Sequence, residues 1–217
     1  MPSLAEDLLL LLLDDEDGRS VVDSTRRDHA VAGAVLVDLA RTGRVTPAEA
    51  GDDAKEDYGV VRDTAPTGDA VLDAAIAKLA EKPVKMEKAV GLLAKDSAKG
   101  VLAQLVDRGL VREEETKVLG LFRQKSWPAE DVEYEAGIRR DIEAALFGGA
   151  RPDERTGCLI TLLHACGAIA KVIDGDKATV MQRAKEIAEG DWASTAVRKA
   201  IDNANLMVIT VFVAGAS

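Results

Sequence analysis

The sequence has 217 residues, with 28 Lys and Arg against 38 Asp and Glu, which gives a formal net charge of −10 and a pI of about 4.8. This balance argues against binding to nucleic acid, because phosphate contacts require a basic face that releases counterions. Apolar residues make up 47% of the chain, enough to close a sizeable core, whereas aromatic residues make up only 3%. This composition, rich in Ala and Leu, favours helices over a β-sandwich, so we expect a mainly α fold.

The N-terminal part of the chain predicts helices separated by acidic breaks and short strands. Ser3 and Glu6 stand in the order of a capping box, in which each side chain satisfies an open amide of the other. Gly18 and Gly43 supply stops after apolar runs. The expected elements in chain order are a helix over 3–13, a short strand over 19–24, a buried helix over 29–41, a helix start at the second capping box over 46–49 and a short strand over 58–62.

The rest of the chain predicts further helices around one hairpin. Apolar residues recur with helical spacing before Pro83, which ends that helix. The expected elements are a helix over 69–82, two helices within 84–108, a hairpin over 110–122 with the acidic turn 113–115, and helices from 128 onward with breaks near 148–149, 167, 174–176 and 190–191.

Motifs of enzymatic chemistry are missing from the sequence. There is no GxGxxG, no Walker phosphate loop, no HExxH and no GxSxG. His29 and His164 are the only histidines, and the apolar neighbours of His164 favour a hydrogen-bonded core histidine over a metal ligand. We therefore expect a protein that is not an enzyme and holds no cofactor and no metal.

The cysteines and the apolar runs bear on the compartment. Cys158 and Cys166 are eight residues apart, about 12 Å along a helix, which is too far for a disulfide and predicts two buried free thiols. The Leu run over 8–13 is short and follows acidic residues, unlike an export signal. The apolar run over 206–213 is too short to span a bilayer and predicts a core helix. These features favour the cytoplasm.

Three basic clusters stand out against the negative total charge. The pair Arg26 and Arg27 lies at a helix entrance, where amide dipoles also favour anions, and is the best candidate for an anion site. For the clusters Arg139 with Arg140 and Arg151 with Arg155, we expect helix-surface ion pairs that contribute little to stability.

A helix followed by a hairpin also raises the alternative of a winged-helix DNA-binding regulator. Residues 35–45 and 101–111 align without gaps, each as a helix that ends in Gly and leads into a strand. The expected recognition helix over 98–108 carries only Lys99 and Arg108 as cations, and the acidic wing over 113–115 would repel phosphate. We therefore expect no nucleic-acid partner.

Several segments together resemble the Golgi phosphoprotein 3 family of peripheral membrane proteins. No single segment is specific, but their ordered conjunction over nearly the whole chain is. The matching stretches are residues 4–13 (LAEDLLLLLL), 33–45 (GAVLVDLARTGRV), 65–73 (APTGDAVLD), 104–111 (QLVDRGLV) and 183–201. The resemblance implies a single, essentially all-α globular domain over 1–217 with a projecting β-hairpin, and the start of the chain close to the first family helix suggests a bacterial-type member.

The resemblance also implies a function and a site. Eukaryotic members recognise phosphatidylinositol 4-phosphate on Golgi membranes and retain glycosyltransferases there. The Trp and Arg of the family's headgroup pocket fall on Asp23 and Ala32 here, and two further family arginines fall on Lys95 and Ala98. Because Lys95 keeps the only cation of that set, we hypothesise that Arg26 and Arg27 rebuild an anion site with Lys95.

From these observations we expect a cytoplasmic protein that lies peripherally on the inner face of a membrane and binds anionic phospholipids, by family resemblance phosphoinositides. The hairpin is expected to insert into the membrane or to mediate homo-oligomer or partner contacts. The alternative is an interaction or scaffold protein without lipid affinity. The apolar side chains expected at the hairpin tip are Val118, Leu119, Leu121 and Phe122.

Overall fold

The computed structural model describes residues 2–52, 58–118, 122–149 and 151–190, together with residues 198 and 202. Within these ranges the fold is mainly helical with short strands and one hairpin, so the predicted fold class is confirmed. The helices are α1 (Leu4–Leu11), α2 (Ser24–Arg41), α3 (Ala70–Ala80), α4 (Met86–Asp107), α5 (Val132–Phe147), α6 (Glu154–Ala165), α7 (Ile169–Val172) and α8 (Lys177–Ala188).

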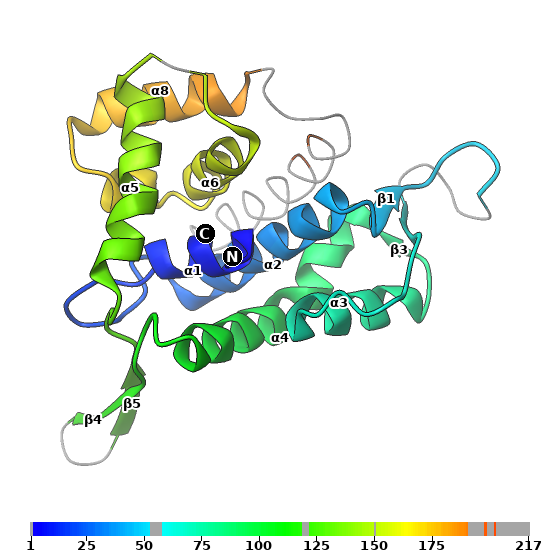
Figure 1. The fold of residues 1–217 in the computed structure, drawn as a ribbon, viewed down its shortest axis with the longest axis horizontal. Coiled ribbons are helices and arrows are strands. Elements are labelled where there is room, and N and C mark those ends of the chain that lie inside the picture. The colour runs from blue at the N-terminus through cyan, green and yellow to red at the C-terminus, as the bar shows by residue number, and fades with distance from the viewer. Residues whose placement is uncertain are drawn as a thin grey trace, which may run out of the picture.

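The described strands form two separate antiparallel sheets. The first has the order β1-β2-β3 and consists of β1 (Val45–Pro47), β2 (Tyr58–Val61) and β3 (Val84–Lys85). The second is the hairpin of β4 (Glu114–Val118) and β5 (Phe122–Ser126). Figure 1 shows this hairpin standing away from the helical body, beyond the C-terminal end of α4.

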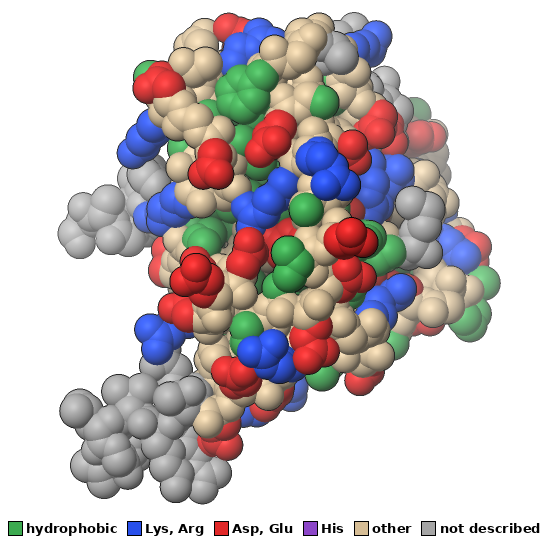
Figure 2. All heavy atoms as spheres, turned by 60° about the vertical axis from the view of Figure 1, so that its left-hand side comes forward, with side chains coloured by type: hydrophobic (Ala, Val, Ile, Leu, Met, Phe, Trp, Pro, Cys, Tyr) green, Lys and Arg blue, Asp and Glu red, His purple; other side chains and the backbone are tan. Residues whose placement is uncertain are grey.

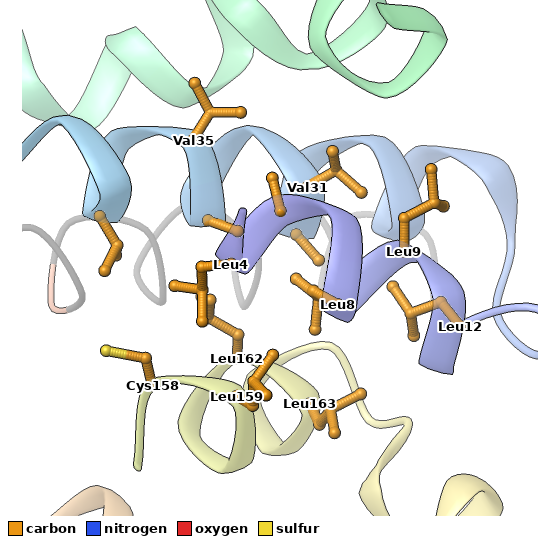
Figure 3. Close-up of a cluster of buried hydrophobic side chains, with 14 of the residues drawn as sticks. Leu4, Leu8, Leu9, Leu12, Val31, Val35, Cys158, Leu159, Leu162 and Leu163 are labelled. Atoms are coloured by element: carbon orange, nitrogen blue, oxygen red, sulfur yellow. The ribbon is translucent and has the colours of Figure 1, made fainter. Parts of the chain in front are cut away.

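Helix α1 lies inside the core. The predicted capping box is present, since the Ser3 side chain accepts from the Glu6 amide and the Glu6 carboxylate accepts from the Ser3 amide. The helix is hydrophobic over most of its circumference, as expected of a helix that is buried on all sides. Figure 3 shows α1 between α2 and α6, with Leu8 facing the leucines of α6 and Leu9 on the side of α2.

Burying α1 also buries its acidic residues, which are held by a network of cations and hydroxyls. Asp7 is 2% exposed, and its carboxylate accepts from Nε of Arg155 at 2.8 Å and from the Tyr134 hydroxyl at 2.6 Å. The Asp38 carboxylate of α2 accepts from the amide of Leu4 at 2.9 Å and thereby caps α1 from a neighbouring helix. Arg155 thus ties α6 to α1.

The prediction of weak surface ion pairs is therefore wrong for two arginines. Arg155 pairs with the buried Asp7, and Arg139 pairs with Glu135, which is 3% exposed. Burial raises the pKa of Asp7, and it raises the pKa of Glu135 to about 7 against the opposing charge of Arg139. These pairs belong to the core and not to the solvated surface.

Two predicted elements in the N-terminal part are wrong for local reasons. Residues 19–24 form no strand beyond the isolated bridge between Leu13 and Ser20, because Asp23 caps α2 through the Arg26 amide and starts the helix at Ser24. Residues 46–49 start no helix, because Thr46 and Pro47 pair with β2. Pro47 is tolerated there because β1 is an edge strand.

The segment from 84 to 126 also departs from prediction. Residues 86–107 form one helix and not two, and Gly100 within it approaches α3 so closely that a Cβ would lie 2.8 Å from Val71 Cγ2. The hairpin strands lie four residues later than predicted. Glu114 and Glu115 belong to strand β4 and not to a turn, in register with Ser126 and Lys125.

The predicted helices beyond residue 128 are confirmed as far as residue 190, with breaks at Gly149, Gly167 and Gly175, which all have positive φ. The helix predicted over 206–213 lies outside the described residues. Among the helices that the structure describes, none is long and apolar enough to cross a bilayer.

Candidate anion-binding site

Charged residues of both signs are interspersed over the face of the molecule shown in Figure 2, with no large area of a single sign. An anion site on this face therefore cannot rest on a large basic area. A hollow of about 510 Å³, which we call the basic pocket, lies among the start of α2, the C-terminal half of α4 and the base of the hairpin. Its lining residues are Arg27, Asp28, Lys95, Ala98, Lys99, Leu102, Ala103, Val106, Asp107, Glu113, Lys125 and Trp127.

The pocket lining has a positive balance of charge. Four cations, Arg27, Lys95, Lys99 and Lys125, face three carboxylates, so the local formal charge is +1 in a chain of net charge −10. Helix α4 places Lys95 and Lys99 one turn apart on the same face. Both lysines are exposed, and within the described part of the chain neither forms an ion pair.

The other two cations are already paired with carboxylates of the lining. The Arg27 guanidinium donates from Nε at 2.9 Å and from Nη2 at 2.7 Å to one Asp28 oxygen. The Lys125 ammonium lies 2.5 Å from the Glu113 carboxylate, and this hydrogen bond raises the pKa of Lys125. Arg27 and Lys125 therefore contribute charge to the pocket only in competition with these partners.

Apolar side chains form the rest of the lining of the basic pocket. Leu102 and Val106 continue the face of α4 toward the hairpin, and Trp127 follows directly after β5. The Trp127 amide donates to the Gly18 carbonyl at 2.9 Å, and a Cβ at Gly18 would lie 2.2 Å from the Trp127 carbonyl carbon. Glycine at 18, with φ of 64°, therefore lets the acidic loop over 14–18 pack closely against the backbone of Trp127.

The predicted cluster of Arg26, Arg27 and Lys95 is only partly assembled. Arg27 and Lys95 line the same pocket, whereas Arg26 is not part of the lining and pairs with Asp23 at 3.0 Å. That Arg27 and Lys95 bind an anion stays a prediction.

The positions that the family resemblance singled out have clear structural roles. Asp23 is the N-cap of α2, and Ala32 is fully buried within α2, where a guanidinium would meet the core. Lys95 and Ala98 both line the basic pocket.

Sequence reasoning missed Lys99, Lys125 and Trp127 as pocket residues. The spacing of four residues between Lys95 and Lys99 could have revealed Lys99. Lys125 depends on the hairpin register, which was predicted four residues too early.

The expected hairpin tip is described only in its backbone. Val118 and Phe122 are opposite each other as the last described pair of the hairpin, while Leu119 and Leu121 lie outside the described residues. The role of these four residues in membrane insertion or self-association stays a prediction.

Among the described residues, the cysteines and His164 do not come together with other reactive groups in one site. Cys158 and Cys166 are free and buried, as predicted, and burial raises the pKa of each thiol to about 12. His164 is half-buried, burial lowers its pKa, and its Nδ1 has no hydrogen-bond partner among the described residues, contrary to the prediction. Within the same residues no group of three His, Cys, Asp or Glu side chains could hold a metal.

A comparison with known families finds a match over nearly the whole chain. The profile of the Golgi phosphoprotein 3 (GPP34) family matches residues 4–204. A search of curated proteins found no match. The matched range contains all residues of the basic pocket and both hairpin strands.

Proposed function

The chain belongs to the Golgi phosphoprotein 3 (GPP34) family, and from this premise we propose that it is a peripheral membrane protein that binds acidic lipid headgroups in the basic pocket. Members of the family are generally non-enzymatic lipid-binding proteins, and they bind phosphatidylinositol 4-phosphate at Golgi membranes. A phosphoinositide is the family-implied version of the ligand. Bacterial-type membership and a location on the inner face of a membrane remain predictions.

The observation that carries this proposal is the pair of ammonium groups of Lys95 and Lys99 in a concave wall, neither of which forms an ion pair with a described residue. Each cation near an anionic bilayer contributes about 1 kcal/mol to attraction. A cation that is already paired contributes less, because the ligand must compete with its carboxylate. In a protein of charge −10, two unpaired lysines in one hollow are the strongest local attraction for a phosphate in the described lining.

The position of the hairpin supports a bilayer as the source of the headgroup. Strands β4 and β5 project from the helical body (Figure 1). Lys125 on β5 and Trp127 directly after it belong to the pocket lining, so the base of the hairpin adjoins the pocket. A hairpin tip inserted in the bilayer would bring the pocket to the level of the headgroups. The winged-helix alternative is disfavoured, because Asp107 at the end of α4 and Glu113 directly before β4 place negative charge where a DNA phosphate would lie.

The proposal is tested by cosedimentation with phosphatidylcholine vesicles that contain phosphatidylinositol 4-phosphate, phosphatidylserine or phosphatidylglycerol at low salt. Lys95→Glu with Lys99→Glu should lower the partition coefficient by about 30-fold or more, at about 1 kcal/mol per lost cation. The matched control is Lys88→Glu with Lys177→Glu, which makes the same charge change at exposed lysines outside the pocket lining.

Two outcomes would overturn the proposal. If the wild type binds none of these vesicles at low salt, the lipid-binding function is wrong and the alternative of an interaction or scaffold protein is favoured. If both double variants lose the same affinity, attraction is spread over the surface and the basic pocket is not the site.

A further inference from the structure

The basic pocket contains its own competing anions. Asp28 and Glu113 line the same hollow as the cations that they hold, with contacts of 2.7 Å to Arg27 and 2.5 Å to Lys125. Their side chains are partly exposed, at 21% for Asp28 and 44% for Glu113, so an incoming anion can reach both pairs from solvent.

Such pairs are weak enough to be exchanged. Partly exposed ion pairs contribute little to stability, because water and salt screen them. A phosphomonoester carries about −1.5 to −2 charges at neutral pH and three strong acceptor oxygens, whereas a carboxylate carries one charge. A phosphomonoester headgroup can therefore take over Arg27 and Lys125, but its affinity is reduced by the energy of the two displaced pairs.

We propose that Asp28 and Glu113 are autoinhibitory residues of the basic pocket, which compete with the headgroup for Arg27 and Lys125 and keep membrane binding weak and reversible. This inference rests on the proposed function. Lys95 and Lys99 provide the first contact, and the two paired cations join only when the carboxylates are displaced.

The inference predicts a gain of binding on removal of an acidic side chain. Glu113→Gln keeps the shape of the side chain and should raise the partition coefficient on phosphatidylcholine vesicles containing phosphatidic acid by about two- to five-fold. The gain on vesicles containing phosphatidylglycerol should be smaller, because a phosphodiester carries only one charge. Asp28→Asn should act in the same direction, and the two gains should add.

The chain offers matched controls. Glu114 lies next to Glu113, pairs with Arg112 at 2.7 Å and is not part of the pocket lining, so Glu114→Gln makes the same charge change in the same hairpin. Asp63→Asn serves likewise for Asp28, because Asp63 pairs with Arg44 at 2.7 Å outside the lining. In a Lys125→Met background the gain from Glu113→Gln should shrink to that of Glu114→Gln.

Inorganic phosphate, compared with chloride at equal ionic strength, separates a lipid headgroup from free phosphate. We expect it to leave the thermal unfolding midpoint of the Glu113→Gln variant unchanged. A rise in that midpoint, without a gain on phosphatidic acid vesicles, would assign the competition to a soluble phosphomonoester and overturn the lipid inference.

The remaining outcomes separate this inference from the proposed function. If the wild type and all variants stay off acidic vesicles at low salt, the proposed function fails. If the wild type binds and Glu113→Gln gains no more than Glu114→Gln, headgroup binding stands and the autoinhibitory role is wrong.

Discussion

The ion pair that joins α1 to α6 and the ion pairs of the basic pocket have the same chemistry but differ in how deeply they are buried. Asp7 is 2% exposed and holds Arg155 and Tyr134, so its charge is committed to the fold. The side chains of Glu113 and Lys125 are 44% and 54% exposed, so their contact is open to exchange with a solvent anion. Burial, more than distance, decides whether such a pair is committed to the fold or open to exchange.

The largest effect is expected from removing the cation of the buried ion pair. Arg155→Met leaves Asp7 without its cation inside the core and should lower the free energy of unfolding by about 3–5 kcal/mol. Arg112→Met, at the exposed pair with Glu114, should lower it by less than about 1 kcal/mol. Urea unfolding followed by circular dichroism measures both. Equal losses would show that the Asp7 network is no stronger than a surface pair.

The second prediction concerns pH and the other buried carboxylate of the network. Burial raises the pKa of Asp38 to about 6 from an ordinary value of 3.8. Between these two values the native state binds more protons than the unfolded state, so the free energy of unfolding falls as pH rises through this window. The Asp38 contribution to this fall is about 3 kcal/mol.

Asp38→Asn removes the titrating group and keeps an oxygen that can accept from the amides of Leu4 and Ala5. We expect the variant to lose less stability than the wild type between pH 4.5 and 7.5, measured by urea unfolding across that range. Asp52 provides a control that titrates below this range, because its hydrogen bond with Arg62 lowers its pKa to about 2, so Asp52→Asn should leave the slope between pH 4.5 and 7.5 unchanged. An unchanged pH profile in Asp38→Asn would contradict the assignment to Asp38.

The contrast between the two regions also explains what the sequence could predict. The capping box at Ser3 and the Gly stops are local patterns, so the helices built on them were predicted. The role of Arg155 depends on Asp7, which is 148 residues away in the chain, and no local pattern encodes that contact.

The candidate site also combines residues that local patterns predict with residues that only the folded chain brings together. Arg27 and Lys95 could be proposed from charge and family position. Lys125 enters the pocket only through the hairpin register, which the glutamates at 113–115 obscured because they resemble a solvated turn. Their pairing with Lys125 and Arg112 is a property of the folded hairpin.

Ionic strength should affect the exposed charges of the pocket more than the buried charges of the core. Raising the ionic strength from about 0.1 to about 1 M shortens the Debye length from about 10 to about 3 Å, which screens exposed charges far more than buried ones. We expect the partition coefficient on acidic vesicles to fall about tenfold or more. The free energy of unfolding should change by less than about 1 kcal/mol, because the α1 network is shielded from solvent. Salt-resistant vesicle binding would mean that hairpin insertion, and not the basic pocket, drives association.

The smallest expected effect separates two adjacent arginines, which the sequence alone treats as one cluster. Arg27→Ala removes a cation of the pocket lining and leaves Asp28 unpaired beside the ligand, so vesicle binding should fall about fivefold. Arg26→Ala makes the same charge change at a residue outside the lining, paired with Asp23, and should leave binding within about twofold of wild type. Cosedimentation on phosphatidic acid vesicles measures both. If Arg26 and Arg27 matter equally, the bilayer responds to the charge of the whole α2 entrance, and the enclosure of Arg27 with Lys95 adds nothing to recognition.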